Sequence, residues 1–398
     1  MTDVITPFRI AIPQADLDDL AQRLARTRWP QEIGDNSQWQ AGMNLGYMRE
    51  LVDYWRTQYD WRAQEAAMNL LPQFRTVIDG VPVHFVHIKG KRAEGAPAPI
   101  PLIINHGWPW TFWDMRKIIG PLTDPAAHGG DAADAFDVIA PSLPGFAFSS
   151  PLTTEGMFFN PTADVWVKLM DRLGYDRFAT QGGDIGSFVS ARLGHKYADR
   201  VIGVHLHLAG AVMPPFPAPD DYAPEEREWG AKFARFMAEG NGYMQIQRTR
   251  PQTIGFAMHD SPVGLAAWLT EKRRAWSDCG GDVESVFSKD DLITNAMLYW
   301  LTDTYVSSAR HYYETKAEAM APAHDRQPPV EAPTALLQFK GDVWMQPRKW
   351  AERYYNLKRW NIAERGGHFA PMETPDVLVD DIRAFFRTLR PDLLQNHG

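Results

Sequence analysis

The 398-residue sequence contains a single cysteine, Cys279. One cysteine excludes a disulfide framework within the chain and a cysteine-rich zinc site. The sequence also lacks a run of the roughly 18–20 apolar residues needed to cross a bilayer. Its first 12 residues do not show the basic region and apolar stretch of a signal peptide. From these absences we expect a cytoplasmic protein without a membrane anchor.

Basic residues are not in excess either. The chain has 41 Lys and Arg against 49 Asp and Glu, a formal net charge of −8, and no basic patch stands out. Nucleic acid is therefore not an expected partner. Hydrophobic residues make up 44% and charged residues 23% of the chain, as in ordinary globular proteins. This length suits one large catalytic domain with insertions, or two average domains.

Short apolar segments alternate with helical patterns through much of the chain. Strands are expected at 101–105, 136–140, 177–181, 201–207, 334–339 and 359–363, and helices at 163–173, 185–197, 347–355 and 375–389. Such alternation predicts an α/β protein with a mainly parallel sheet flanked by helices.

Three stretches rich in proline or glycine, at 89–101, 212–224 and 321–333, divide the chain. They predict an N-terminal region at 1–95, a first core half at 96–212, a mostly helical insert at 213–332 and a second core half at 333–398. The N-terminal region should contain helices near 17–24 and 47–59, followed by a hairpin. Its strands, 74–78 and 81–88, are joined by Asp-Gly, which supplies the positive φ angles of a tight turn.

A candidate nucleophile lies in the sequence Gly-Gly-Asp-Ile-Gly at 182–186, between an expected strand and an expected helix. Small residues on both sides of Asp184 allow a sharp strand-to-helix turn that presents the central side chain at the top of the sheet. Serine is often the central residue of such turns, but no Gly-x-Ser-x-Gly occurs here. A carboxylate can attack carbon directly and form an ester. The alternative is that Asp184 only caps the helix.

A second motif, His-Gly-Trp-Pro at 106–109, follows the expected strand 101–105. A turn at this place brings backbone N–H groups close to the nucleophile. The amides of Trp108 and Ile185 could then form an oxyanion hole. A plain turn without function is the alternative interpretation.

A candidate base and its acidic partner follow two late strands. His368 lies in Gly-Gly-His-Phe at 366–369, after the strand ending near 363, where this architecture holds its general base. Asp342 follows the strand 334–339 and can orient His368 through a ring N–H. Each residue alone could be an ordinary loop residue. The chain order of nucleophile, acid and base is that of α/β-hydrolases, which favours the joint interpretation.

These motifs, together with Arg-Trp-Pro at 28–30 and Asp-Ser-Pro-Val-Gly-Leu at 260–265, resemble the microsomal-type epoxide hydrolases over nearly the whole chain. The resemblance implies an α/β-hydrolase core, a helical lid and an N-terminal meander wrapped against both. It implies conversion of an epoxide and water to a vicinal diol. An ester on Asp184 would be hydrolysed by water that His368 and Asp342 activate, without metal or organic cofactor.

The resemblance also implies two lid tyrosines that protonate the epoxide oxygen. Tyr243 matches the first and Tyr312 the second, with the adjacent Tyr313 as a rival. The chain departs from the family at Trp110, where glycine is common. The Trp110 ring either lines the substrate pocket beside Trp108 or packs away from it, under the lid or meander.

Two other functions remain open from the sequence. Dehalogenases also use an aspartate nucleophile, but they usually carry Trp or Arg where this chain has Ile185. A catalytically inert hydrolase that acts as a binding protein is the second alternative. The expected partner is a small hydrophobic epoxide, and the sequence leaves a homodimer open.

Overall fold

The apolar segments of the chain pair into one nine-stranded sheet with the order β1-β2-β3-β5-β4-β6-β7-β8-β9. The structure, a computed structural model, describes residues 4–92, 94–210, 216–315 and 320–395. The strands are β1 Thr6–Phe8, β2 Gln73–Ile78, β3 Val81–Ile88, β4 Ile100–Asn105, β5 Phe136–Pro141, β6 Phe178–Gly182, β7 Val201–Leu206, β8 Val330–Phe339 and β9 Tyr355–Ala363.

The sheet has an antiparallel edge and a parallel centre. Strands β1, β2, β3 and β5 pair antiparallel in that order, whereas β5, β4, β6, β7, β8 and β9 run parallel. Every residue of β5, β6 and β7 is buried, as expected for strands covered on both faces. The predicted fold class, an α/β protein with a mainly parallel sheet, is confirmed.

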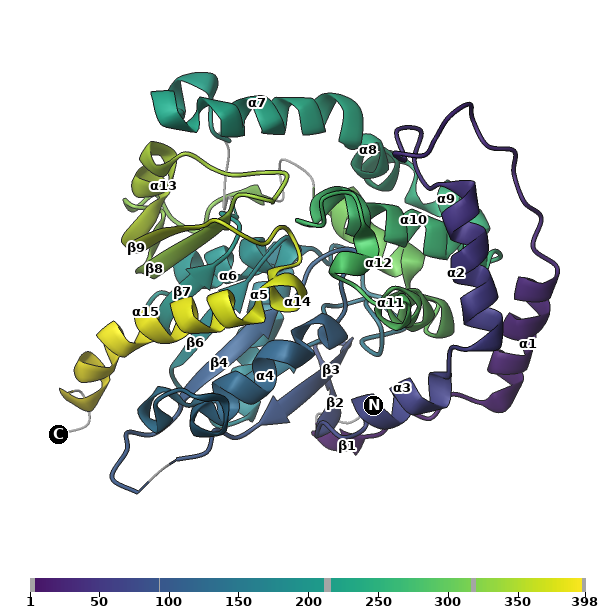
Figure 1. The fold of residues 1–398 in the computed structure, drawn as a ribbon. Coiled ribbons are helices and arrows are strands. Elements are labelled where there is room, and N and C mark those ends of the chain that lie inside the picture. The colour runs from purple at the N-terminus through teal and green to yellow at the C-terminus, as the bar shows by residue number, and fades with distance from the viewer. Residues whose placement is uncertain (1–3, 93, 211–215, 316–319, 396–398) are drawn as a thin grey trace.

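Helices cover both faces of the parallel strands. In Figure 1, α4 (Arg116–Thr123) and α15 (Pro375–Gln395) lie in front of the sheet, and α5 (Phe159–Arg172) and α6 (Ile185–Lys196) lie behind it. Two shorter helices, α13 (Arg348–Tyr354) and α14 (Ala370–Glu373), follow β8 and β9. The core halves are thus built as the alternating sequence pattern predicts.

The insert between β7 and β8 forms a helical lid at the end of the sheet where the parallel strands terminate (Figure 1). Its α-helices are α7 Arg227–Arg235, α8 Gly242–Thr249, α9 Pro251–Met258, α10 Pro262–Trp276, α11 Lys289–Leu301 and α12 Tyr305–Glu314. A π-helical turn, Phe236–Gly240, extends α7. Short 3-10 turns lie at Phe112–Met115, Pro125–His128, Ala132–Asp134, Pro219–Asp221, Pro224–Glu226 and Val283–Ser285.

The N-terminal helices pack on the outside of the lid. They are α1 (Gln14–Ala25), α2 (Leu45–Thr57) and α3 (Trp61–Met68), and Figure 1 shows α1 and α2 beside the lid helices. Tyr54 donates a hydrogen bond of 2.9 Å to Asp290 at the start of α11. The strands β2 and β3, which follow in the same region, join the core sheet, so this part of the chain contacts both lid and core.

Several expected element boundaries differ from the structure; the last helix, for example, ends at residue 395 and not at 389. Helix α5 begins at residue 159, and strands β8 and β9 begin at residues 330 and 355, each four residues earlier than the pattern predicts. Proline cannot donate a hydrogen bond to its neighbouring strand, so the sequence suggests that β8 starts after Pro333. A register shift between Val330 and Pro333 accommodates this residue. The expected boundary at 212/213 lies outside the described residues.

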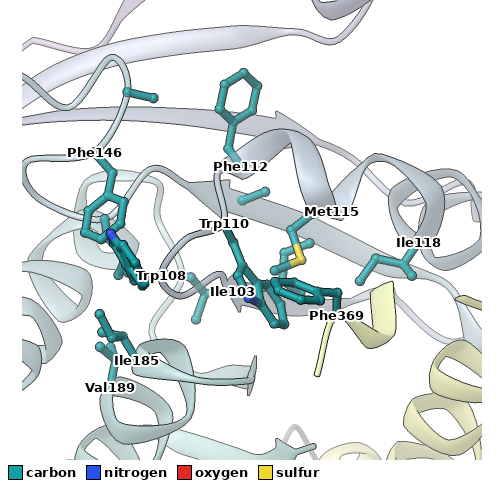
Figure 2. Packing of buried hydrophobic residues seen from close by; sticks show 14 of the residues in the cluster. Ile103, Trp108, Trp110, Phe112, Met115, Ile118, Phe146, Ile185, Val189 and Phe369 are labelled. Carbon is teal, nitrogen blue, oxygen red and sulfur yellow. The ribbon is translucent and has the colours of Figure 1, made fainter. Parts of the chain in front are cut away.

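A continuous hydrophobic core joins the sheet, its helices and the lid. Figure 2 shows the part near the carboxyl end of β4, where Trp108 lies toward Ile185 and Trp110 packs beside Phe369. Within the described part of the chain, no helix combines the length and apolar character required to span a membrane.

Candidate active site

The turn between β6 and α6 holds Asp184 in a strained backbone conformation. Its φ is 48° and its ψ is −130°, a region that residues with side chains rarely adopt. The turn is possible because its neighbours are small. A Cβ atom at residue 182 would come within 2.2 Å of the Gly186 carbonyl oxygen, and one at residue 186 within 2.3 Å of the Asn105 carbonyl oxygen. The predicted strand-to-helix turn is therefore present.

The turn after β4 approaches the Asp184 carboxylate closely. The Trp108 amide donates a hydrogen bond of 2.7 Å to Asp184 Oδ1. Gly107 makes room for this contact, since a Cβ atom there would lie 2.3 Å from the same oxygen. Ile185 is the first residue of α6, where backbone N–H groups have no partner within the helix. The two predicted oxyanion-hole residues therefore flank Asp184.

His368 lies between two carboxylates. Its Nδ1 is 3.0 Å from Asp342 Oδ1, and its Nε2 is 3.3 Å from Asp184 Oδ2. Burial disfavours the imidazolium, but the charges and hydrogen bonds of Asp342 and Asp184 outweigh this effect and raise the pKa of His368 to about 10. The structure therefore brings together three residues, 184, 342 and 368, that lie up to 184 positions apart in the chain. The two carboxylates favour the charged form of the imidazole between them.

The lid places two tyrosines over this site. Tyr243 of α8 stacks on the Trp108 ring, with 5.1 Å between centroids and 5° between planes. Tyr312 of α12 meets both rings edge-on, at 5.9 Å from Tyr243 and 6.0 Å from Trp108. Burial, followed by the charge of Asp184, raises the pKa of Tyr243, and burial raises that of Tyr312. Tyr313 is 45% exposed, so Tyr312 is the one of the two neighbours that faces the site.

Trp110 is fully buried behind His368. Its ring stacks on His207 at 5.6 Å, meets His368 edge-on at 5.6 Å and packs against Phe369 at 5.5 Å. Figure 2 shows the ring beside Phe369, while Trp108 lies toward Ile185. This placement favours packing away from the pocket, although behind His368 and not under the meander. A substrate contact by Trp110 stays a prediction.

Three further residues near the site were not predicted from the sequence. The Trp276 ring lies 5.2 Å from His368, and its carbonyl oxygen accepts a hydrogen bond of 3.0 Å from the His368 amide. Glu373 accepts hydrogen bonds from the amides of Phe369, at 2.7 Å, and Asp278, at 2.8 Å. Asp278 in turn accepts one from the Gly366 amide at 2.9 Å. These contacts fix the histidine loop, 366–369, to the end of lid helix α10.

Glu373 could have been noticed from its position, since it follows His368 by five residues on a short helix. Burial raises the pKa of its carboxyl to about 7, against the opposing effect of its two backbone hydrogen bonds. Among the residues that the structure describes, no group of three or more His, Cys, Asp and Glu side chains could hold a metal ion.

Comparison with known proteins identifies the family. A family model described as "Epoxide hydrolase N terminus" matches residues 5–115, and one described as "alpha/beta hydrolase fold" matches residues 100–375. Epoxide hydrolase 1 of Oryctolagus cuniculus is 36% identical over 96% of this chain and 88% of its own length. The chain belongs to the epoxide hydrolase family. A candidate epoxide hydrolase of Stigmatella aurantiaca is 43% identical over 97% of this chain and 86% of its own.

Solved structures of this family share the fold. Aspergillus niger epoxide hydrolase matches with a TM-score of 0.84 and 30% identity, covering 97% of both chains. Juvenile hormone epoxide hydrolase from Bombyx mori matches with a TM-score of 0.87 and 27% identity, covering 98% of this chain and 96% of that one. The predicted family and the predicted α/β-hydrolase fold are thereby confirmed, and an ester on the aspartate is the mechanism typical of this family.

Proposed function

We propose that this chain hydrolyses small hydrophobic epoxides to vicinal diols through an ester on Asp184. One observation carries the proposal. The Asp184 carboxylate is held 2.7 Å from the Trp108 amide and 3.3 Å from His368, below the buried Tyr243 and the partly buried Tyr312 of the lid. A carboxylate in that position can attack carbon, and the groups around it match both steps of the reaction.

In the first step, one oxygen of Asp184 attacks an epoxide carbon and the carbon–oxygen bond of the ring breaks. Tyr243 and Tyr312 bind the epoxide oxygen, and one of them transfers its proton to that oxygen as the ring opens. The products of this step are an ester on Asp184, with the new alcohol still attached, and a phenolate. Donors of this kind are needed because an alkoxide is a poor leaving group.

In the second step, His368 removes a proton from water, which attacks the ester carbonyl. His368 must first become neutral, and the alkylation itself favours this change, because the ester no longer carries the charge that raises the pKa of His368. The phenolate takes up the proton that His368 loses, so the site keeps its net charge before water attacks. When the tetrahedral intermediate collapses, the bond between the Asp184 carboxyl carbon and the diol oxygen breaks. The proton left on the added hydroxyl passes to the leaving alkoxide, so the diol, the Asp184 carboxylate and the protonated His368 result. The amides of Trp108 and Ile185 hold the negative charge of the tetrahedral intermediate. Asp342 orients the imidazole and stabilises its charged form.

A single turnover in ¹⁸O-labelled water tests this proposal. If Asp184 is the nucleophile, the label enters the Asp184 carboxylate in the first turnover, and the diol carries only unlabelled oxygen. The peptide containing residue 184 is then examined by mass spectrometry. Label that appears directly in the diol would contradict the assignment of Asp184, because water would then attack the epoxide carbon itself.

Assays of halide release and of diol formation separate the remaining alternatives. Halide release from haloalkanes in place of diol formation would favour a dehalogenase. Absence of both reactions, with Asp184→Ala behaving like the parent protein, would favour an inert binding protein. The cytoplasmic location and the homodimer stay predictions.

A further inference from the structure

A buried lysine lies against the ring of the proposed proton donor. Lys272 is on α10, its side chain is 11% exposed, and its Nζ lies 5.3 Å from the centroid of the Tyr243 ring. The same Nζ lies 5.7 Å from the Trp268 centroid and 6.0 Å from that of Trp276. Trp268, Lys272 and Trp276 are spaced by four residues, so they share one face of the helix.

The burial of this ammonium group needs an explanation, because lysine is almost never buried unless a partner stabilises its charge. Its ion-pair partner is Glu271, the preceding residue, whose side chain is 23% exposed. That pair would also form in solvent, so it does not explain why the lysine stem points toward the site. The three aromatic rings offer the cation their electron-rich faces, and such contacts are stronger when solvent is excluded.

Ring opening of the epoxide leaves a negative charge on Tyr243, whose ring lies against the Lys272 ammonium group. When Tyr243 gives up its proton it becomes a phenolate inside a buried site, and burial together with the charge of Asp184 raises its pKa. Trp108, Trp276 and Tyr312 surround the ring, and none of them carries positive charge. A phenolate ring is more electron-rich than a phenol, so the attraction of Lys272 to it increases as the proton leaves.

We propose that Lys272 is a positioning residue that holds a positive charge against the Tyr243 ring and so favours proton donation to the epoxide oxygen. This inference rests on the role of Tyr243 in the proposed function. Lys272 acts through Tyr243 and not on the substrate. Its loss should therefore slow the formation of the Asp184 ester and should not slow the hydrolysis of that ester, because reprotonation of the phenolate does not need the cation.

The test compares Lys272→Met with Lys272→Arg in rapid-mixing experiments that follow ester formation and ester hydrolysis separately. We expect Lys272→Met to slow ester formation about tenfold, which corresponds to about 1.4 kcal/mol and lies in the range of a desolvated cation–π contact. Lys272→Arg should restore most of the rate. If Lys272→Met does not fold, Lys272→Gln replaces it, because glutamine removes the charge and keeps a polar group at the end of an apolar stem.

Lys196→Met is the matched control. The Lys196 Nζ lies 5.2 Å from the Tyr197 ring and pairs with Asp164, so this variant removes a comparable contact at the far end of α6. It should leave both rates unchanged. An equal slowing of ester formation and ester hydrolysis in Lys272→Met would overturn the inference, because loss of structure affects both steps.

A double-mutant cycle separates this inference from the proposed function. If Tyr243 donates the proton, Tyr243→Phe slows ester formation, and adding Lys272→Met then has little further effect. If Lys272→Met causes the same tenfold loss in the Tyr243→Phe background, Lys272 does not act through Tyr243 and the inference is wrong. If Tyr243→Phe alone does not slow ester formation, the assigned role of Tyr243 fails, whatever Lys272 does.

Discussion

Removing the charge of Asp184 should lower the pKa of His368. Asp184→Asn keeps the size of the side chain and an oxygen that accepts from Trp108, but it replaces the anion 3.3 Å from the imidazole Nε2. At an effective dielectric constant of about 20, Coulomb's law gives about 5 kcal/mol for two charges at this separation. This energy corresponds to a more than thousandfold change in proton affinity. The pKa of His368 should therefore fall from about 10 toward its ordinary value of 6.5, although the charge of Asp342, the largest of the effects that raise this pKa, remains in the variant.

Nuclear magnetic resonance of selectively labelled histidine measures this change directly, by titration of the His368 ring signals. Asp303→Asn is a control, because it removes an equal charge from an exposed carboxylate beside His259 and should not move the His368 titration. A His368 pKa that stays near 10 in Asp184→Asn would refute the reasoning. Asp342 alone would then keep the pKa of His368 raised, and esterification of Asp184 would not help His368 to become neutral.

The same shift has a consequence for stability. A histidine whose pKa is raised by folding stabilises the protein fully below its unfolded pKa, and this contribution is lost as the pH rises through the folded value. In the parent protein the loss should extend from about 6.5 to about 10. In Asp184→Asn the loss of this stabilisation should be complete at a lower pH. Urea unfolding at several pH values measures the difference.

The remaining predictions concern the base, the lid and the core behind the base. His368→Gln should form the ester and fail to hydrolyse it, so mass spectrometry after substrate addition should detect protein plus substrate; an active variant without adduct would contradict the role of His368. Tyr312→Phe should slow ester formation by about 10²-fold, whereas Tyr313→Phe should not, because Tyr313 is 45% exposed; the reverse result in rapid-mixing kinetics would exchange the two roles. Trp110→Ala should lower the free energy of unfolding by about 3–5 kcal/mol, since the ring is fully buried. A loss below about 1 kcal/mol in urea unfolding, together with an altered preference between bulky and slender epoxides, would indicate instead that Trp110 lines the substrate pocket.

The sequence predicted the parts of the site that depend on strand ends. Asp184, Asp342 and His368 each follow a strand whose apolar pattern is visible, and the ends of parallel strands meet at one edge of the sheet. Gly182 makes room for the Gly186 carbonyl in the same turn, whereas Gly183 and Gly186 make room for the His207 ring and the Asn105 carbonyl. All three glycines lie within two residues of Asp184, so the local motif was enough to recognise the turn.

Contacts that depend on the docking of the lid could not be predicted in this way. Trp276 and Lys272 lie on a helix whose polar and apolar residues do not segregate clearly, and the site residues that they contact, His368 and Tyr243, come from other segments. Trp110 shows the same limit within the core. Its position after the oxyanion turn is local information, but the direction of its ring depends on His207, which follows β7, and on Phe369 of the histidine loop.

The link between the end of α10 and the histidine loop has a consequence for engineering. Exchanging lids between related enzymes is an attractive way to change which substrates are accepted, and it assumes that the lid is a separate module. Here the Trp276 carbonyl and the Asp278 carboxylate hold the amides of His368 and Gly366, and Glu373 ties the two segments together. A transplanted lid would therefore have to bring 276–278 together with a compatible 366–373, and chimaeras joined between these segments should lose the second half-reaction first.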